Sequence, residues 1–141
     1  MKGRKKVLVV DDNCDAADTL AMLLQTLDCD CRVAYSGEQA LAMVEREWPD
    51  LVILDLFMPH MSGYDVARTL RRRPDGDRMR LVAHTAMSSQ MHHEAVVEAG
   101  FDEHLIKPAA LPDLLALVDD ADPGGRLYQH GAPSPRERRR A

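Results

Sequence analysis

Short apolar runs alternate with amphipathic stretches along most of this chain. Four runs of four or five residues predict buried strands, at 6–10, 51–54, 81–84 and 103–106. A fifth and less apolar strand is expected at 31–35. After each strand, apolar residues recur at three- and four-residue steps, which is the spacing of an amphipathic helix. The chain therefore predicts five strand–helix units.

Polar residues mark the ends of several of these helices. Ser36, followed three residues later by Gln39, is a capping-box pattern that opens the second helix, and Ser62 can cap the third. The fourth helix is expected from about residue 88 to residue 99. The three arginines at 71–73 lie at the end of the third helix, where we expect them to interact favourably with the helix dipole.

Strands that are buried on both faces and linked by right-handed helical crossovers form a parallel sheet with helices on its two sides. A chain of 141 residues has the length of one such domain. We expect the folded domain at residues 1–121. The segment 122–141 is rich in proline, glycine and arginine and cannot bury a core, so it is expected to be a disordered tail.

Charge and hydropathy exclude several classes of protein. Residues 1–121 hold 13 basic and 21 acidic residues, so the folded part is acidic and unsuited to binding DNA non-specifically. No apolar run approaches the ~18 residues of a membrane span. The basic start of the chain is followed by a short strand and two acids rather than by a signal-peptide core, so a cytoplasmic location is expected.

Five side chains with related chemistry follow the ends of four predicted strands. Asp11 and Asp12 follow the first strand, Asp55 the third, Thr85 the fourth and Lys107 the fifth. Because the carboxyl ends of parallel strands lie at one edge of a sheet, where such folds bind ligands, we expect these five side chains to lie close together.

This set of groups is suited to phosphoryl transfer. Clustered carboxylates favour a hard divalent cation, Mg²⁺ above all, with Mn²⁺ as an alternative. Lys107 and Thr85 offer a positive charge and a hydroxyl to phosphoryl oxygens. An aspartate carboxylate can itself be the nucleophile and form an aspartyl phosphate.

The ordered set of motifs resembles the receiver domain of two-component response regulators. The stretches that carry this resemblance are residues 9–13, 55–63, 85–86 and 107–108, within a match that covers about residues 5–121. The spacing from Asp55 to Thr85 and from Thr85 to Lys107, thirty and twenty-two residues, is usual in that family. The resemblance implies a flavodoxin-like (βα)5 fold, with a doubly wound sheet of strand order 2-1-3-4-5.

The resemblance also implies roles for individual residues. Asp55 would accept the phosphoryl group from the phosphohistidine of a histidine kinase or a histidine phosphotransfer protein. Asp12, Asp55 and the backbone carbonyl of Phe57 would ligate Mg²⁺, with Asp11 acting partly through water. Thr85 and Lys107 would contact the phosphoryl group, and the Lys107–Pro108 peptide bond would be cis.

Two departures from the family pattern bear on signalling. His104 occupies the position of the family's switch aromatic, so a movement of Thr85 would have to be coupled to an imidazole whose charge varies near neutral pH. The positions two residues beyond Asp55 and Thr85 are the apolar Phe57 and Met87. In that family, polar residues at these two positions help a water molecule to attack the phosphoryl group. The departure from the pattern therefore implies a comparatively long-lived phosphoryl group.

Taken together, the sequence predicts a single-domain response regulator that signals by protein contact through its fourth helix, fifth strand and fifth helix. It is expected to act alone or with a hybrid kinase, since no DNA-binding or catalytic output domain follows residue 121. One alternative is a binding module that keeps the fold but is not phosphorylated. Another is a Mg²⁺-dependent phosphohydrolase, although such enzymes usually carry a second acid where Phe57 stands.

Overall fold

The computed structural model describes residues 4–86 and 93–119. The strands are β1 (Lys6–Val10), β2 (Asp30–Ala34), β3 (Leu51–Asp55), β4 (Arg80–Thr85) and β5 (Glu103–Ile106). The helices are α1 (Cys14–Thr26), α2 (Gly37–Arg46), α3 (Gly63–Arg71), α4 (His93–Ala99) and α5 (Leu111–Val118), with a 3-10 turn, η1 (Gly76–Arg78). The predicted tail 122–141, Met87 and the first part of the predicted fourth helix lie outside the described residues.

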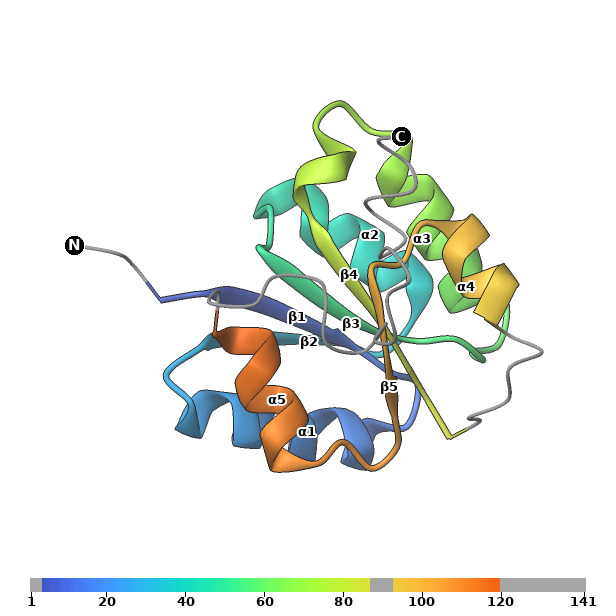
Figure 1. Ribbon diagram of the computed structural model, residues 1–141. Helices are drawn as coiled ribbons and strands as arrows, with labels where there is room; N and C mark the ends of the chain where they lie inside the picture. Colours follow the sequence, from blue (N-terminus) through green and yellow to red (C-terminus); the bar gives the residue numbers. More distant parts are fainter. Residues whose placement is uncertain (1–3, 87–92, 120–141) are drawn as a thin grey trace, which may run out of the picture.

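The five strands form one parallel sheet in the order β2-β1-β3-β4-β5, which confirms the predicted (βα)5 fold. Helices α1 and α5 cover one face of the sheet, and α2, α3 and α4 cover the other (Figure 1). None of the helices in the described part of the chain has the length and hydropathy that a membrane span requires.

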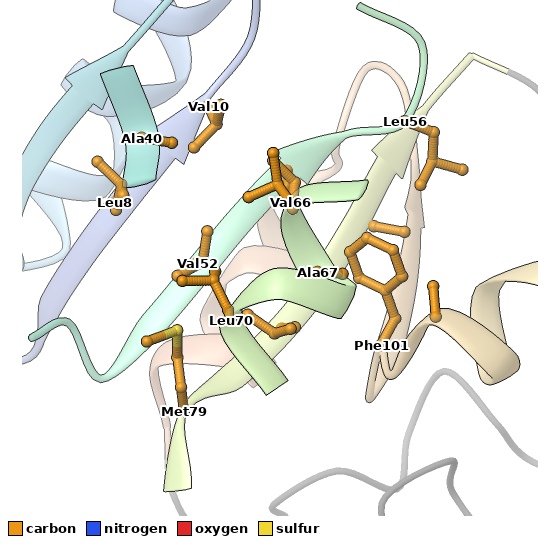
Figure 2. Close-up of a cluster of buried hydrophobic side chains, with 14 of the residues drawn as sticks. Leu8, Val10, Ala40, Val52, Leu56, Val66, Ala67, Leu70, Met79 and Phe101 are labelled. Carbon is orange, nitrogen blue, oxygen red and sulfur yellow. The ribbon is translucent and has the colours of Figure 1, made fainter. Parts of the chain in front are cut away.

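Alternating residues of each strand supply the two cores. Leu8 and Val10 belong to the cluster beneath α2 and α3, whereas Val7 and Val9 belong to the cluster beneath α1 and α5. Figure 2 shows the first cluster, in which Ala67 and Leu70 of α3 lie beside Phe101. Burial on both faces explains why the central strands are continuous apolar runs rather than alternating ones.

The two predicted serine caps are present, with one difference. Ser36 accepts a hydrogen bond from the Gln39 N–H at 3.1 Å, but the Gln39 side chain accepts from the N–H of Tyr35, one residue earlier than in a capping box. Ser62 and Asp65 form the complete capping box at the start of α3. Both hydrogen bonds of the capping box therefore hold the start of α3 in place.

Arg71 forms buried contacts beyond the predicted interaction of residues 71–73 with the dipole of α3. Its side chain is 8% exposed and pairs with Asp102, which is 1% exposed, at 2.7 Å. The guanidinium also donates to the carbonyl oxygens of Gly100 at 2.8 Å and Gly76 at 2.6 Å, and to that of Met79. Arg71 thus joins the end of α3 to the segments that precede β4 and β5.

Candidate functional site

The three predicted acidic residues meet at the carboxyl edge of the sheet. Val10 and Leu54 are partners across β1 and β3, so Asp11 and Asp55, the next residues along, lie side by side. One carboxylate oxygen from each of Asp11, Asp12 and Asp55 lies within 4.8 Å of the other two. We call these three residues the acid pocket.

Burial and charge make the acid pocket unfavourable without a counter-ion. Asp11 and Asp55 are buried, whereas Asp12 is exposed. Burial, followed by the neighbouring Asp11, raises the pKa of Asp55 to about 6, and Lys107 and the Phe57 N–H oppose this effect. A cation in the pocket would remove the repulsion between the carboxylates.

Lys107 and Thr85 lie at the same edge. The Lys107 ammonium donates to Asp11 at 2.8 Å and lies 3.7 Å from a carboxylate oxygen of Asp55. The backbone N–H of Lys107 donates to the carbonyl of the buried Thr85 at 2.8 Å, which places the two residues on adjacent strands. The Lys107–Pro108 peptide bond is cis. All five residues singled out at the strand ends therefore lie along one edge.

The loops around the acid pocket are fixed by short local contacts. The N–H of Asn13 donates to Asp11 at 3.0 Å, and its side chain caps α1 by accepting from Ala16. A Cβ atom on Gly63 would lie 2.1 Å from the carbonyl oxygen of Asp55, so only glycine allows α3 to begin this close to β3. The N–H of Gly63 donates to the Leu56 carbonyl at 2.9 Å.

Phe57 and His104, the predicted metal-ligand and switch residues, lie in different surroundings. Phe57 donates its backbone N–H to Asp55 at 3.4 Å and is 48% exposed. His104 lies half-buried in β5 and is the partner of Ala83, two residues before Thr85. His104 and Thr85 therefore face the same side of the sheet, one strand apart.

His84 is a site residue that the sequence did not reveal. It lies in β4 as the partner of Asp55 and is buried. Burial, followed by the positive charge of Lys107, lowers the pKa of His84 to about 4, so its imidazole is neutral at pH 7. The only available signal was a titratable residue at the end of an otherwise apolar run.

A groove of about 500 Å³ lies between α1 and the segment that follows β5. It is lined in part by Ala16, Leu20, Leu23, His84, Lys107 and Pro108. Lys107 therefore belongs both to the wall of this groove and to the surroundings of the acid pocket. We call this feature the α1 groove.

Comparison with known proteins identifies the family. Residues 7–119 match the response regulator receiver domain. The chain is 36% identical to the response regulator MprA of Mycobacterium leprae over 113 residues, which cover 80% of this chain and 49% of MprA. The chain thus spans about half the length of that relative.

Solved structures agree with this match. A putative response regulator from Chloroflexus aurantiacus is 29% identical with a TM-score of 0.76, and the match covers 80% of this chain and 93% of that one. The receiver domain of Saccharomyces cerevisiae Ssk1, crystallised with the histidine phosphotransfer protein Ypd1, is 25% identical with a TM-score of 0.74 and coverages of 84% and 88%. This chain belongs to the response regulator receiver domains of two-component signalling.

Proposed function

We propose that Asp55 accepts a phosphoryl group from the phosphohistidine of a histidine kinase or a histidine phosphotransfer protein, in a reaction that requires Mg²⁺. The observation that carries this proposal is the convergence of three carboxylates within 4.8 Å, with the Lys107 ammonium 3.7 Å from Asp55. The family match supports a phosphoacceptor switch rather than an unphosphorylated binding module or a phosphohydrolase.

The donor set of the acid pocket suits Mg²⁺ or, as an alternative, Mn²⁺. All of its groups are oxygens, and such ions bind through a few carboxylates together with water and phosphoryl oxygens. Asp12, Asp55 and the carbonyl of Phe57 would hold the ion, with Asp11 contributing partly through water. When bound, the ion neutralises charge on the carboxylates and on the phosphoryl oxygens.

Asp55, Lys107 and Thr85 would have different roles in this transfer. The Asp55 carboxylate attacks phosphorus, so that a P–O bond forms while the P–N bond to the donor histidine breaks. Lys107 needs only a short movement away from Asp11 to donate to a phosphoryl oxygen. The hydroxyl of Thr85, which lies on the neighbouring strand, would donate to a second oxygen. Positioning and neutralisation of charge account for most of the catalysis in such transfers.

Treatment with acetyl phosphate, followed by intact mass spectrometry, tests this proposal. With Mg²⁺ we expect one phosphoryl group per chain, and after chelation of the metal we expect none. Release of phosphate from the reagent much faster than the isolated, labelled chain loses its phosphoryl group would instead indicate a phosphohydrolase. A chain that stays unlabelled with Mg²⁺ present would indicate a binding module and would contradict the assignment.

We further propose that the phosphodonor protein docks on the α1 groove, next to Lys107. Leu23 lines this groove and is exposed, and Met22 beside it on α1 is also exposed. The Ssk1 receiver domain was crystallised with its histidine phosphotransfer protein, which supports a protein donor for this chain as well. A donor seated there could present its phosphohistidine to the edge of the sheet that carries Asp55.

Leu23→Glu is expected to slow phosphotransfer from a protein donor by tenfold or more, about 1.4 kcal/mol, while labelling by acetyl phosphate stays unchanged. The added charge would have to be buried beneath the donor. The donor is a purified histidine kinase selected for phosphorylating the wild-type chain. Leu115→Glu is the matched control, because Leu115 is equally apolar and exposed but lies on α5 outside the lining of the groove. Equal slowing by both variants would contradict this docking site.

The downstream protein is proposed to contact the surface of α4, β5 and α5. Exposed apolar side chains on β5 and α5 support this choice, namely Ile106, Leu111 and Leu115. The donor and the target would then use different surfaces of the same domain. We place the receiver function in residues 1–121.

A further inference from the structure

Three aromatic rings form a row from the core to Phe57, whose backbone contacts Asp55. Phe101, which is fully buried, packs among side chains of α3 (Figure 2). The ring centroid of Tyr64 lies 6.4 Å from that of Phe101, with the ring planes at 82°. The centroid of Phe57 lies 6.2 Å from that of Tyr64, with the planes at 76°. Both contacts are edge-to-face, the arrangement that aromatic pairs favour.

Tyr64 is well placed to hold its neighbours because its own backbone is fixed. It is the second residue of α3, whose capping box and hydrogen bond from Gly63 to Leu56 tie the helix to the segment that follows Asp55. Tyr64 is half-buried, and its ring lies against that of the fully buried Phe101. Phe57, by contrast, is 48% exposed, and its ring meets that of Tyr64 edge to face.

The hydroxyl of Tyr64 adds nothing to this arrangement. It is buried, and among the described residues no group forms a hydrogen bond with it. Burial raises the pKa of this hydroxyl, so it carries no charge at neutral pH. The ring is therefore the part of Tyr64 that acts on Phe57.

We propose that Tyr64 is a positioning residue that holds the ring of Phe57 at the rim of the acid pocket and so prolongs the lifetime of the phosphoryl group on Asp55. This inference rests on the proposed phosphorylation of Asp55. The backbone N–H of Phe57 donates to Asp55 at 3.4 Å, so the ring is carried by a residue that contacts the reacting carboxylate.

The reaction that this ring would slow is hydrolysis. The oxygen of a water molecule attacks phosphorus, and the bond between phosphorus and the Asp55 oxygen breaks. The products are inorganic phosphate and the Asp55 carboxylate, and the proton goes to solvent. A phenyl ring has neither a donor nor an acceptor to orient that water molecule, and a fixed ring excludes water more completely than a rotating one.

Tyr64→Leu and Tyr64→Phe form the matched pair for the test. After labelling with acetyl phosphate and removal of the reagent, the half-life of the phosphoryl group is followed by mass spectrometry. Tyr64→Leu is expected to shorten it by about two- to tenfold, the size of one aromatic contact expressed as a rate. Tyr64→Phe, which keeps the ring, is expected to leave it within about twofold. Equal half-lives for wild type and Tyr64→Leu would overturn the proposal.

A second measurement separates this role from a general loss of structure. In a Phe57→Ala background, Tyr64→Leu should have no further effect on the half-life, because the ring that it positions is gone. A further shortening there, equal to that in the wild-type background, would overturn the positioning role.

The contact itself can be followed without phosphorylation. The chain contains two phenylalanines, so fluorophenylalanine labelling gives two ¹⁹F signals, which Phe57→Leu assigns. In the metal-free protein, Tyr64→Leu should move the Phe57 signal towards the solvent-exposed value, whereas Tyr64→Phe should not. An unchanged signal in Tyr64→Leu would refute the contact. Failure of acetyl phosphate to label the wild type would instead refute the phosphorylation of Asp55.

Discussion

Asp55→Asn is expected to abolish labelling by acetyl phosphate and to stabilise the metal-free protein at pH 7 by about 1–2 kcal/mol. The first effect follows because an amide cannot replace the carboxylate nucleophile. The second follows because burial and the adjacent Asp11 disfavour the ionised form of Asp55, as the raised pKa of about 6 shows. The energy is reduced from the full value of that shift because the acid pocket is open to solvent at the exposed Asp12.

The pH dependence of this gain has a defined sign. In the folded, metal-free protein the pKa of Asp55 is about 6, above its ordinary 3.8. The free energy of unfolding therefore falls as the pH rises from 3.8 to about 6 and Asp55 ionises. His84 acts in the opposite direction. Its pKa falls from 6.5 to about 4, so the stability that its neutral form supports is lost as the pH falls through that range. His84 is present in both proteins, so the difference between their free energies of unfolding at each pH isolates the contribution of Asp55.

Urea denaturation between pH 4 and pH 8, without metal, measures the difference in free energy of unfolding. We expect the two proteins to have similar stabilities near pH 4 and the variant to be the more stable above pH 6. Mg²⁺ should stabilise the wild type far more than the variant. Asp15→Asn is the control, since Asp15 is an exposed acid outside the acid pocket. Labelling of Asp55→Asn at the wild-type level would refute Asp55 as the acceptor.

Arg71→Met should lower the free energy of unfolding by about 3–5 kcal/mol. The substitution keeps the length of the side chain but leaves Asp102 as a buried charge without its guanidinium. It also removes the donor to the carbonyl oxygens of Gly100, Gly76 and Met79. Asp102 would keep its hydrogen bond from the Leu81 N–H, which cannot replace a positive charge.

Chemical denaturation of Arg71→Met beside Arg72→Met tests this expectation. Arg72 is the next residue and is exposed, so its substitution should change the stability by less than about 0.5 kcal/mol. The difference between the two variants then measures the buried contacts rather than the loss of one positive charge. Equal effects of the two substitutions would show that Arg71 is no more important than a surface arginine.

The sequence predicted the sheet and its active edge because both depend on local patterns. Apolar runs such as 6–10 and 51–54 define the strands, and parallel pairing brings the residues after them to one edge. Asp11, Asp55 and Lys107 could therefore be placed together without knowledge of any contact between side chains.

Features that depend on distant packing could not be predicted in this way. Arg71 and Asp102 are thirty-one residues apart, and three adjacent arginines give no signal of which one is buried. His84 could not be distinguished from the end of an apolar strand until its neighbours Asp55 and Lys107 were in place. The α1 groove arises from two segments that meet only in the folded domain.

Lys107 lies next to the acid pocket and also lines the α1 groove, which has a consequence for the release of the donor protein. Its ammonium group lies 3.7 Å from the Asp55 carboxylate, while the same side chain forms part of the surface on which we place the donor. If Lys107 shifts towards a modified Asp55, that surface changes, and the donor's affinity changes with it. By thermodynamic reciprocity, a donor that prefers the unmodified form favours its own departure once its phosphoryl group has been delivered. Lys107 would thus favour the exchange of a dephosphorylated donor for a phosphorylated one.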